Sequence, residues 1–134
     1  MGNVLALDIG GRRIGVALSD ESLRIPHPLT TVIVDGGEIE KLRLLVEEMQ
    51  PVQIVVGFPR NQAGEMTEQT KTVEKFAEKL KEFEVPITFQ DESLTSVIAE
   101  QQLRSLGKPY TKEMIDSAAA TIILQDYLEE KYGH

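Results

Sequence analysis

The chain has 134 residues, of which 22 are Asp or Glu and 14 are Lys or Arg, so its formal charge at neutral pH is −8. This net negative charge argues against a broad, non-specific nucleic-acid-binding protein, because such proteins neutralise phosphates with many Lys and Arg residues. It is compatible with a small binding site that contains a few arginines and a divalent cation. The absence of cysteine excludes disulfides and thiolate metal sites, and two histidines are too few for a zinc site by themselves. No apolar run approaches the ~18–20 residues of a membrane span, and no basic-then-apolar leader is present. We therefore expect one domain, residues 1–134, in a cytoplasmic protein.

The stretch NVLALDIGGRRIGVALSD, residues 3–20, is the most informative part of the chain. Residues 4–7 are a short apolar run of strand formers that ends in Asp8, and the two glycines that follow Ile9 predict a turn. From Arg13 on, large apolar and small residues alternate, which predicts a second strand paired with the first as a hairpin. A carboxylate at the end of a buried central strand loses part of its hydration, which costs free energy unless the group has a partner. Asp8 is therefore either a turn residue bonded to nearby N–H groups or part of a metal or phosphate site.

Strand and helix signals alternate along the rest of the chain. The predicted strands cover 28–34, 52–56 and 87–90; the predicted helices cover 38–49, 95–105 and about 113–131, with another helix capped by Thr67 and a loop at 57–65. Three strands followed by helix–strand–helix–strand and two helices predict an α/β fold. Its mixed five-stranded sheet has antiparallel first three strands, then parallel βαβ units, with helices on both faces.

Acidic residues lie at the ends of two predicted strands and near the start of the last helix. Asp8 ends the first strand and the pair Asp91-Glu92 ends the fifth, and the carboxyl ends of parallel strands meet at one edge of a sheet. Side chains alternate along a strand, so only one member of the pair should face the same side as Asp8. Asp116 is the third candidate, or else an ordinary acid at a helix start. Asp126 also falls near the apolar stripe, but ~15 Å further along the helix.

Four motifs occur in order over most of the chain: LALDIGGRRIGVALSD, VVGFPRNQAGEMTEQT, FQDESLT and KEMIDSAAATIILQDYL. Together they resemble the YqgF/RuvX family of Holliday-junction resolvases and nucleases that mature the small-subunit ribosomal RNA precursor. The resemblance implies a ribonuclease H-like fold, in agreement with the element order. It also implies an active site made of Asp8, Asp91-Glu92 and Asp116. The family's usual Asp-Glu-Arg triplet ends in Ser93 here, so its arginine is missing.

The chemistry of such a site follows from its ligand types. Clustered carboxylates suit hard, oxygen-seeking cations, so Mg²⁺ or Mn²⁺ is the expected cofactor. Two ions ~4 Å apart would clamp the attacking water and the leaving 3′-oxygen of a phosphodiester. In this arrangement Asp8 bridges the ions, and Glu92 and Asp116 bind one each.

Four basic residues are the candidates for contact with nucleic acid. Arg12 and Arg13 follow the first acid, Arg60 lies in the predicted loop, and Lys112 precedes the last helix. Each could instead be ordinary solvated surface charge.

These observations predict a divalent-metal-dependent endonuclease that hydrolyses phosphodiester bonds in structured RNA, branched DNA or both. Pre-16S rRNA 5′-end processing and Holliday-junction resolution are the activities that the resemblance implies. One alternative is a nucleic-acid-binding module with the fold but weak or no catalysis. A nucleotide-binding ATPase-like domain ranks lower, because such enzymes hold nucleotide between two domains of this type. The sequence leaves a monomer and a weak dimer open.

Overall fold

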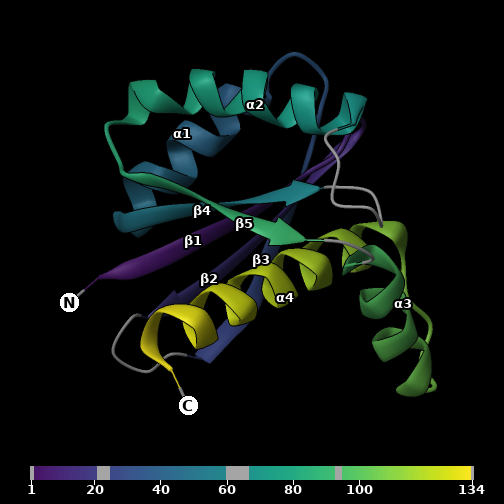
Figure 1. The fold of residues 1–134 in the computed structure, drawn as a ribbon. Helices are drawn as coiled ribbons and strands as arrows, with labels where there is room; N and C mark the ends of the chain where they lie inside the picture. Colours follow the sequence, from purple (N-terminus) through teal and green to yellow (C-terminus); the bar gives the residue numbers. More distant parts are fainter. Residues whose placement is uncertain (1, 21–24, 60–66, 93–94, 134) are drawn as a thin grey trace.

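The computed structural model describes residues 2–20, 25–59, 67–92 and 95–133, and Figure 1 shows the arrangement of its elements. The strands are β1 (Asn3–Ile9), β2 (Arg13–Asp20), β3 (Ile25–Ile33), β4 (Pro51–Pro59) and β5 (Ile87–Glu92). The helices are α1 (Glu38–Met49), α2 (Glu68–Leu80), α3 (Thr95–Ser105) and α4 (Lys112–Tyr132), with a 3₁₀ turn, η1 (Lys81–Phe83), after α2. The predicted bounds of α1 and α3 are confirmed.

The five strands form one mixed sheet in the order β3-β2-β1-β4-β5. β2 pairs antiparallel with both β1 and β3, whereas β4 pairs parallel with both β1 and β5. The predicted α/β class and strand directions are therefore confirmed. Because β1, β4 and β5 are parallel, their carboxyl ends lie at the same edge of the sheet.

Helices cover both faces of this sheet (Figure 1). α1 and α2 lie over one face, where alternate β1 residues such as Leu5 and Leu7 join the larger hydrophobic cluster. α4 lies over the other face, where Ala6 of β1 and Ala17 of β2 pack with Ala120. The small side chains let the α4 backbone come close to the sheet. α3 packs on α4.

β3 begins earlier and β4 ends later than predicted, for different reasons. β3 begins at Ile25 although it contains Pro26 and Pro28; it is an edge strand, where a residue without an N–H is tolerated. β4 continues through Gly57, where the sequence predicts a loop. A Cβ on Gly57 would lie 2.5 Å from Cδ1 of Ile123, so this glycine serves the close approach of α4 and makes no turn.

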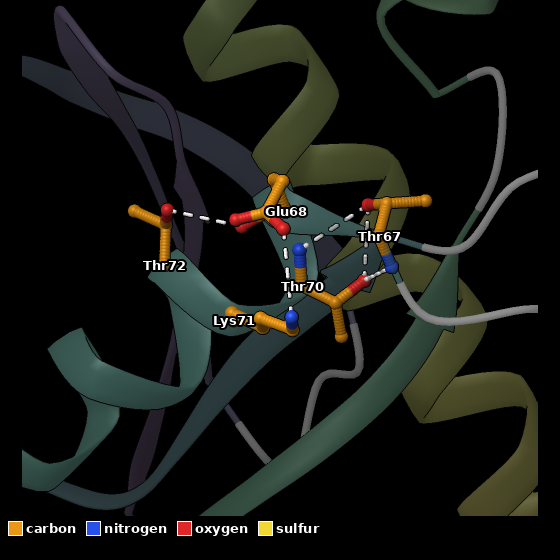
Figure 2. A network of polar contacts seen from close by, with 5 residues as sticks. All are labelled: Thr67, Glu68, Thr70, Lys71 and Thr72. Atoms are coloured by element: carbon orange, nitrogen blue, oxygen red, sulfur yellow. Dashed lines mark hydrogen bonds and ion pairs between the residues drawn. The ribbon is translucent and has the colours of Figure 1, made fainter.

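The start of α2 is fixed to the ends of β1 and β4. Thr67 caps the helix as predicted, and Figure 2 shows the reciprocal bonds between Thr67 and Thr70 that form a capping box. The hydroxyl of Thr70 also donates to the carbonyl of Pro59 at 2.5 Å, and the Gln69 amide donates to the carbonyl of Ile9 at 2.7 Å. These bonds hold the turn after Asp8 from the side opposite α4. No helix in the described part of the chain is both long and apolar enough to cross a membrane.

Candidate active site at the carboxyl edge of the sheet

α4 crosses its face of the sheet diagonally, and this crossing decides which acids meet. Its contacts change strand along its length: Glu113 meets Thr31 of β3, Asp116 meets Gly15 of β2, Ile123 meets Gly57 of β4, and Glu130 meets Gln90 of β5. The first turns of α4 therefore lie over β2 and β3, and the last turns lie over β5.

Asp8 faces α4 from the carboxyl end of β1. Side chains alternate along a strand, and Val4 and Ala6 both belong to the cluster under α4, so Asp8 points to the same side. It is partly buried, in contrast to the exposed turn that follows.

Gly15 brings Asp116 to Asp8. Gly15 lies directly opposite Asp8 in the hairpin register. A Cβ on Gly15 would lie 1.9 Å from the carbonyl oxygen of Asp116, so only a glycine allows α4 to rest here. The two aspartates are close enough for the charge of one to act on the other.

Arg13 holds the side chain of Asp116. Its Nε donates to Oδ2 of Asp116 at 2.5 Å, and neither side chain is more than 25% exposed. The carboxylate raises the pKa of Arg13 further, so the guanidinium keeps its charge. Asp116 is the fifth residue of α4, and its partner is this arginine; the N-terminal N–H of Met114 is capped by Thr111. The interpretation of Asp116 as a mere helix-start acid has no support in these contacts.

The pKa of Asp8 is raised from its ordinary value of 3.8 to about 6. Burial is the larger cause, because it disfavours the charged form, and the negative charge of Asp116 adds to it. A carboxyl group in this state gains from a nearby cation. This is the electrostatic setting in which a divalent metal or a positively charged partner is favoured.

Glu92 faces α4 as well, but it meets a different part of the helix. Its Oε2 accepts from the hydroxyl of Thr95 at 2.9 Å, while Oε1 is buried and finds no donor among the described residues. Burial raises the pKa of Glu92, and the carboxyl group of Asp126 raises it further. When Glu92 is protonated, Oε1 can donate to the carboxylate of Asp126 and is no longer without a partner.

Asp91 points away from these acids. It is exposed and shares the strand face of Phe89, whose ring contacts Phe58 in the cluster on the α1/α2 side. Of the acidic pair that ends β5, Glu92 is thus the member that lies on the face of Asp8 and Asp116.

The predicted basic residues have different surroundings. Arg12 is exposed beside the turn and makes no ion pair within the described part of the chain. Arg13 is engaged by Asp116, and Lys112 is exposed in the first turn of α4. Arg60 and Ser93 lie outside the described residues. Arg12 and Lys112 are therefore the exposed cations nearest in sequence to Arg13 and Asp116.

Comparison with known proteins identifies the family. The family described as "RuvX: Holliday junction resolvase" matches residues 2–130 of the chain. The chain belongs to this family. A relative from Chloroflexus aurantiacus named "Putative pre-16S rRNA nuclease" is 47% identical over 96% of this chain and 87% of the relative. Another with this name, from Dechloromonas aromatica, is 42% identical over 98% of this chain and 94% of the relative.

Solved structures support the RuvX assignment at the level of the fold. Thermus thermophilus RuvC in complex with a Holliday junction substrate aligns with a TM-score of 0.56 at 14% identity, covering 99% of this chain and 97% of that one. The yeast mitochondrial Holliday junction resolvase Ydc2 aligns with a TM-score of 0.54 at 12% identity, covering 98% of this chain and 79% of that one. The ribonuclease H-like fold implied by the sequence motifs is confirmed.

The fit of this RuvX chain to a metal ion rests on Asp8 and Asp116. No group of three or more His, Cys, Asp or Glu side chains in the described ranges is arranged to hold a metal. Mg²⁺ is often bound through one or two protein carboxylates, with waters and substrate phosphates as its other ligands. Asp8 and Asp116 provide two such carboxylates, and Arg13 contacts only Oδ2 of Asp116. In number and type, these two carboxylates are the protein ligands that one such cation would use.

Three features of the site were not predicted from the sequence. They are the ion pair of Arg13 with Asp116, the close approach at Gly15 and the contact of Glu92 with Asp126. The spacing along the helix predicts that Asp126 lies too far from Asp116 to share one ion, but it does not indicate the contact with Glu92. The strand order explains that contact: β4 separates β1 from β5, so the end of β5 meets α4 further along its length.

Proposed function

We propose that this chain is a divalent-metal-dependent endonuclease that hydrolyses phosphodiester bonds in structured nucleic acid. The observation that carries the proposal is the partly buried Asp8, which has a raised pKa and lies beside an Asp116 that Arg13 holds in place. Membership of a resolvase family agrees with this chemistry. The precursor of 16S rRNA is the first substrate to test, because the curated relatives carry that name. A four-way DNA junction is the second.

In this proposal Asp8 and Asp116 hold one Mg²⁺ or Mn²⁺ ion. When bound, such an ion stabilises negative charge on phosphodiester oxygens and lowers the pKa of a coordinated water. Arg13 fixes the orientation of the Asp116 carboxylate, so that one oxygen of that group stays available. Arg12 and Lys112, both exposed, contact substrate phosphates.

Glu92 remains a predicted ligand of a second ion. In the structure its neighbours are Thr95 and Asp126. To bind a metal it must lose its proton and move its carboxylate from Asp126 toward Asp8. The single-ion arrangement at Asp8 and Asp116 requires no such movement.

The test is cleavage of an end-labelled 5′ fragment of pre-16S rRNA and of a four-way DNA junction, each with Mg²⁺, with Mn²⁺ and with EDTA. We expect metal-dependent cleavage that Asp8→Asn abolishes, with substrate binding retained. Asp91→Asn is the matched control, since Asp91 lies on the opposite face, and it should cleave at the parental rate. Binding without cleavage by the parent would support the alternative of a binding module. A thermal shift with Mg-ATP but none with nucleic acid would support the ATPase-like alternative.

A further inference from the structure

A groove runs along the outer edge of β3, on the side of the sheet covered by α1. It has a volume of about 300 Å³. Residues 30–33 of β3 form one wall, and the other wall is formed by Lys41, Leu44, Leu45 and Glu48 of α1. Leu44 exposes an apolar side chain in this groove, since it is 57% exposed. Ile33 lies opposite Arg13 in the strand register and shares the face of Thr31, so its side chain is directed to the α4 side instead. Leu44 and Leu45 therefore form the apolar centre of the groove, between the charges of Lys41 and Glu48.

The groove lies on the open flank of α1. On the other flank Arg43 bonds to Glu40 and to Glu82, and its guanidinium lies over the ring of Phe83. The groove flank instead shows a stripe at helical spacing, residues 41, 44, 45 and 48. Lys41 has a long contact to Asp35 at 3.4 Å, and Glu48 makes no ion pair within the described part of the chain.

The neighbouring edge of β3 has no strand partner within the described part of the chain. The N–H of Val34 donates to the carbonyl of Arg12, so in this antiparallel pair alternate residues of β3 direct their polar groups to β2. Thr31 and Ile33 then direct their N–H and C=O outward. Pro26 and Pro28 protect the first half of the edge but not this second half.

We propose that this groove is the interface of a symmetric homodimer in which α1 of one copy lies antiparallel to α1 of a second copy. The stripe is complementary to itself in that arrangement. About a two-fold axis between Leu44 and Leu45, Leu44 faces Leu45 of the second copy and Lys41 faces Glu48 of the second copy. Both contacts occur twice, as a two-fold interface requires.

The same axis can join the two β3 edges. Around Val32, Thr31 of one copy would pair with Ile33 of the other, and the outward N–H and C=O groups of both residues would find partners. Because this two-fold axis is perpendicular to the sheet, the α4-covered faces of both copies lie on the same side of the joined sheet. The two α4 faces, with Asp8 and Asp116 of each copy, would then open in the same direction.

The net charge of −8 on each copy opposes this association. The interface has to supply apolar burial and local opposite charges to overcome that repulsion. We therefore expect a dimer of modest affinity that moderate salt strengthens, because screening reduces the repulsion between two acidic chains.

The test is sedimentation equilibrium of the full chain from about 5 to 500 μM in 0.15 M salt, with light scattering as a second measure. We expect a monomer–dimer equilibrium. Leu44→Glu should raise the dissociation constant at least ~10-fold, because the changed residue occurs twice in the interface. Leu106→Glu is the matched control, since Leu106 is 66% exposed after α3, far along the chain from the groove, and it should leave the constant unchanged. Circular dichroism confirms that both variants are folded.

A charge exchange tests the pairing itself. Lys41→Glu should weaken the dimer, because it faces Glu48 of the second copy, and Lys41→Glu combined with Glu48→Lys should restore it. A parent that stays monomeric up to 500 μM would overturn the proposal. A dimer that Leu44→Glu does not weaken would overturn it as well, since its interface would lie elsewhere.

Discussion

The raised pKa of Asp8 predicts that replacing this residue stabilises the metal-free protein. Ionisation of Asp8 is disfavoured in the folded state because its pKa is about 6, against an ordinary value of 3.8. A carboxyl group whose folded pKa is raised favours folding below its unfolded pKa. That contribution is lost as the pH rises through the folded pKa. Asp8→Asn keeps the shape of the side chain and removes the charge, so its benefit should appear as the pH rises from about 4 to 6.

The expected magnitude follows from the two pKa values. One pKa unit corresponds to about 1.4 kcal/mol, so full ionisation of Asp8 costs up to about 3 kcal/mol at pH 7.5. At pH 5 only about half of this cost has appeared. The free energy of unfolding of Asp8→Asn, relative to the parent, should therefore increase by about 1–2 kcal/mol between pH 5 and pH 7.5 and then level off.

The assay is urea unfolding of both proteins in EDTA at several pH values from 5 to 8. Asp35→Asn is a control without this pH dependence. The N–H of Gly37 and the side chain of Lys41 lower the pKa of Asp35, so its stabilising contribution is lost only below the pH range of the assay. The difference between Asp35→Asn and the parent should therefore stay constant from pH 5 to 8. A difference between Asp8→Asn and the parent that does not change with pH would refute the reasoning, because Asp8 would then be ionised without cost.

Three further predictions concern the surroundings of this acid. Gly15→Ala should destabilise the protein by about 2 kcal/mol or more and reduce cleavage, because its Cβ would collide with the Asp116 carbonyl; Gly11→Ala, with open space around its Cβ, should do neither. Asp126→Asn should lower the pKa of Glu92, which NMR titration of the carboxyl carbon can measure; an unchanged pKa would mean that the two groups do not interact. Manganese at about 100 times its dissociation constant should stabilise the parent by roughly 2.7 kcal/mol, and equal stabilisation of Asp8→Asn would place the ion elsewhere.

The element order and sheet were predictable because their signals are local. The apolar run before Asp8 and the alternation after Arg13 specify the hairpin, and the helical spacing of residues 38–49 specifies α1 with its observed bounds. The errors at Gly57 and at the start of β3 have a common cause. In a sequence, glycine and proline are taken to indicate turns. Here Gly57 leaves room for α4, and the prolines of β3 are tolerated because β3 is an edge strand. Both circumstances arise only when the elements pack together.

The candidate site was predictable in its residues more than in its contacts. Strand ends and parallel pairing bring Asp8 and Glu92 to the same edge of the sheet, and alternation excludes Asp91 from their face. The crossing angle of α4 has no local signal in the sequence. It decides that Asp116 meets Asp8 and Arg13, whereas Asp126 meets Glu92.

The most direct test of the central claim is the binding of Mn²⁺ itself, measured by electron paramagnetic resonance without substrate. The account predicts that the parent binds Mn²⁺ and that Asp8→Asn and Asp116→Asn each weaken this binding at least ~10-fold, since each removes a carboxylate ligand. Asp91→Asn should bind Mn²⁺ as the parent does. Equal affinity in the parent, Asp8→Asn and Asp116→Asn would contradict a metal site formed by Asp8 and Asp116.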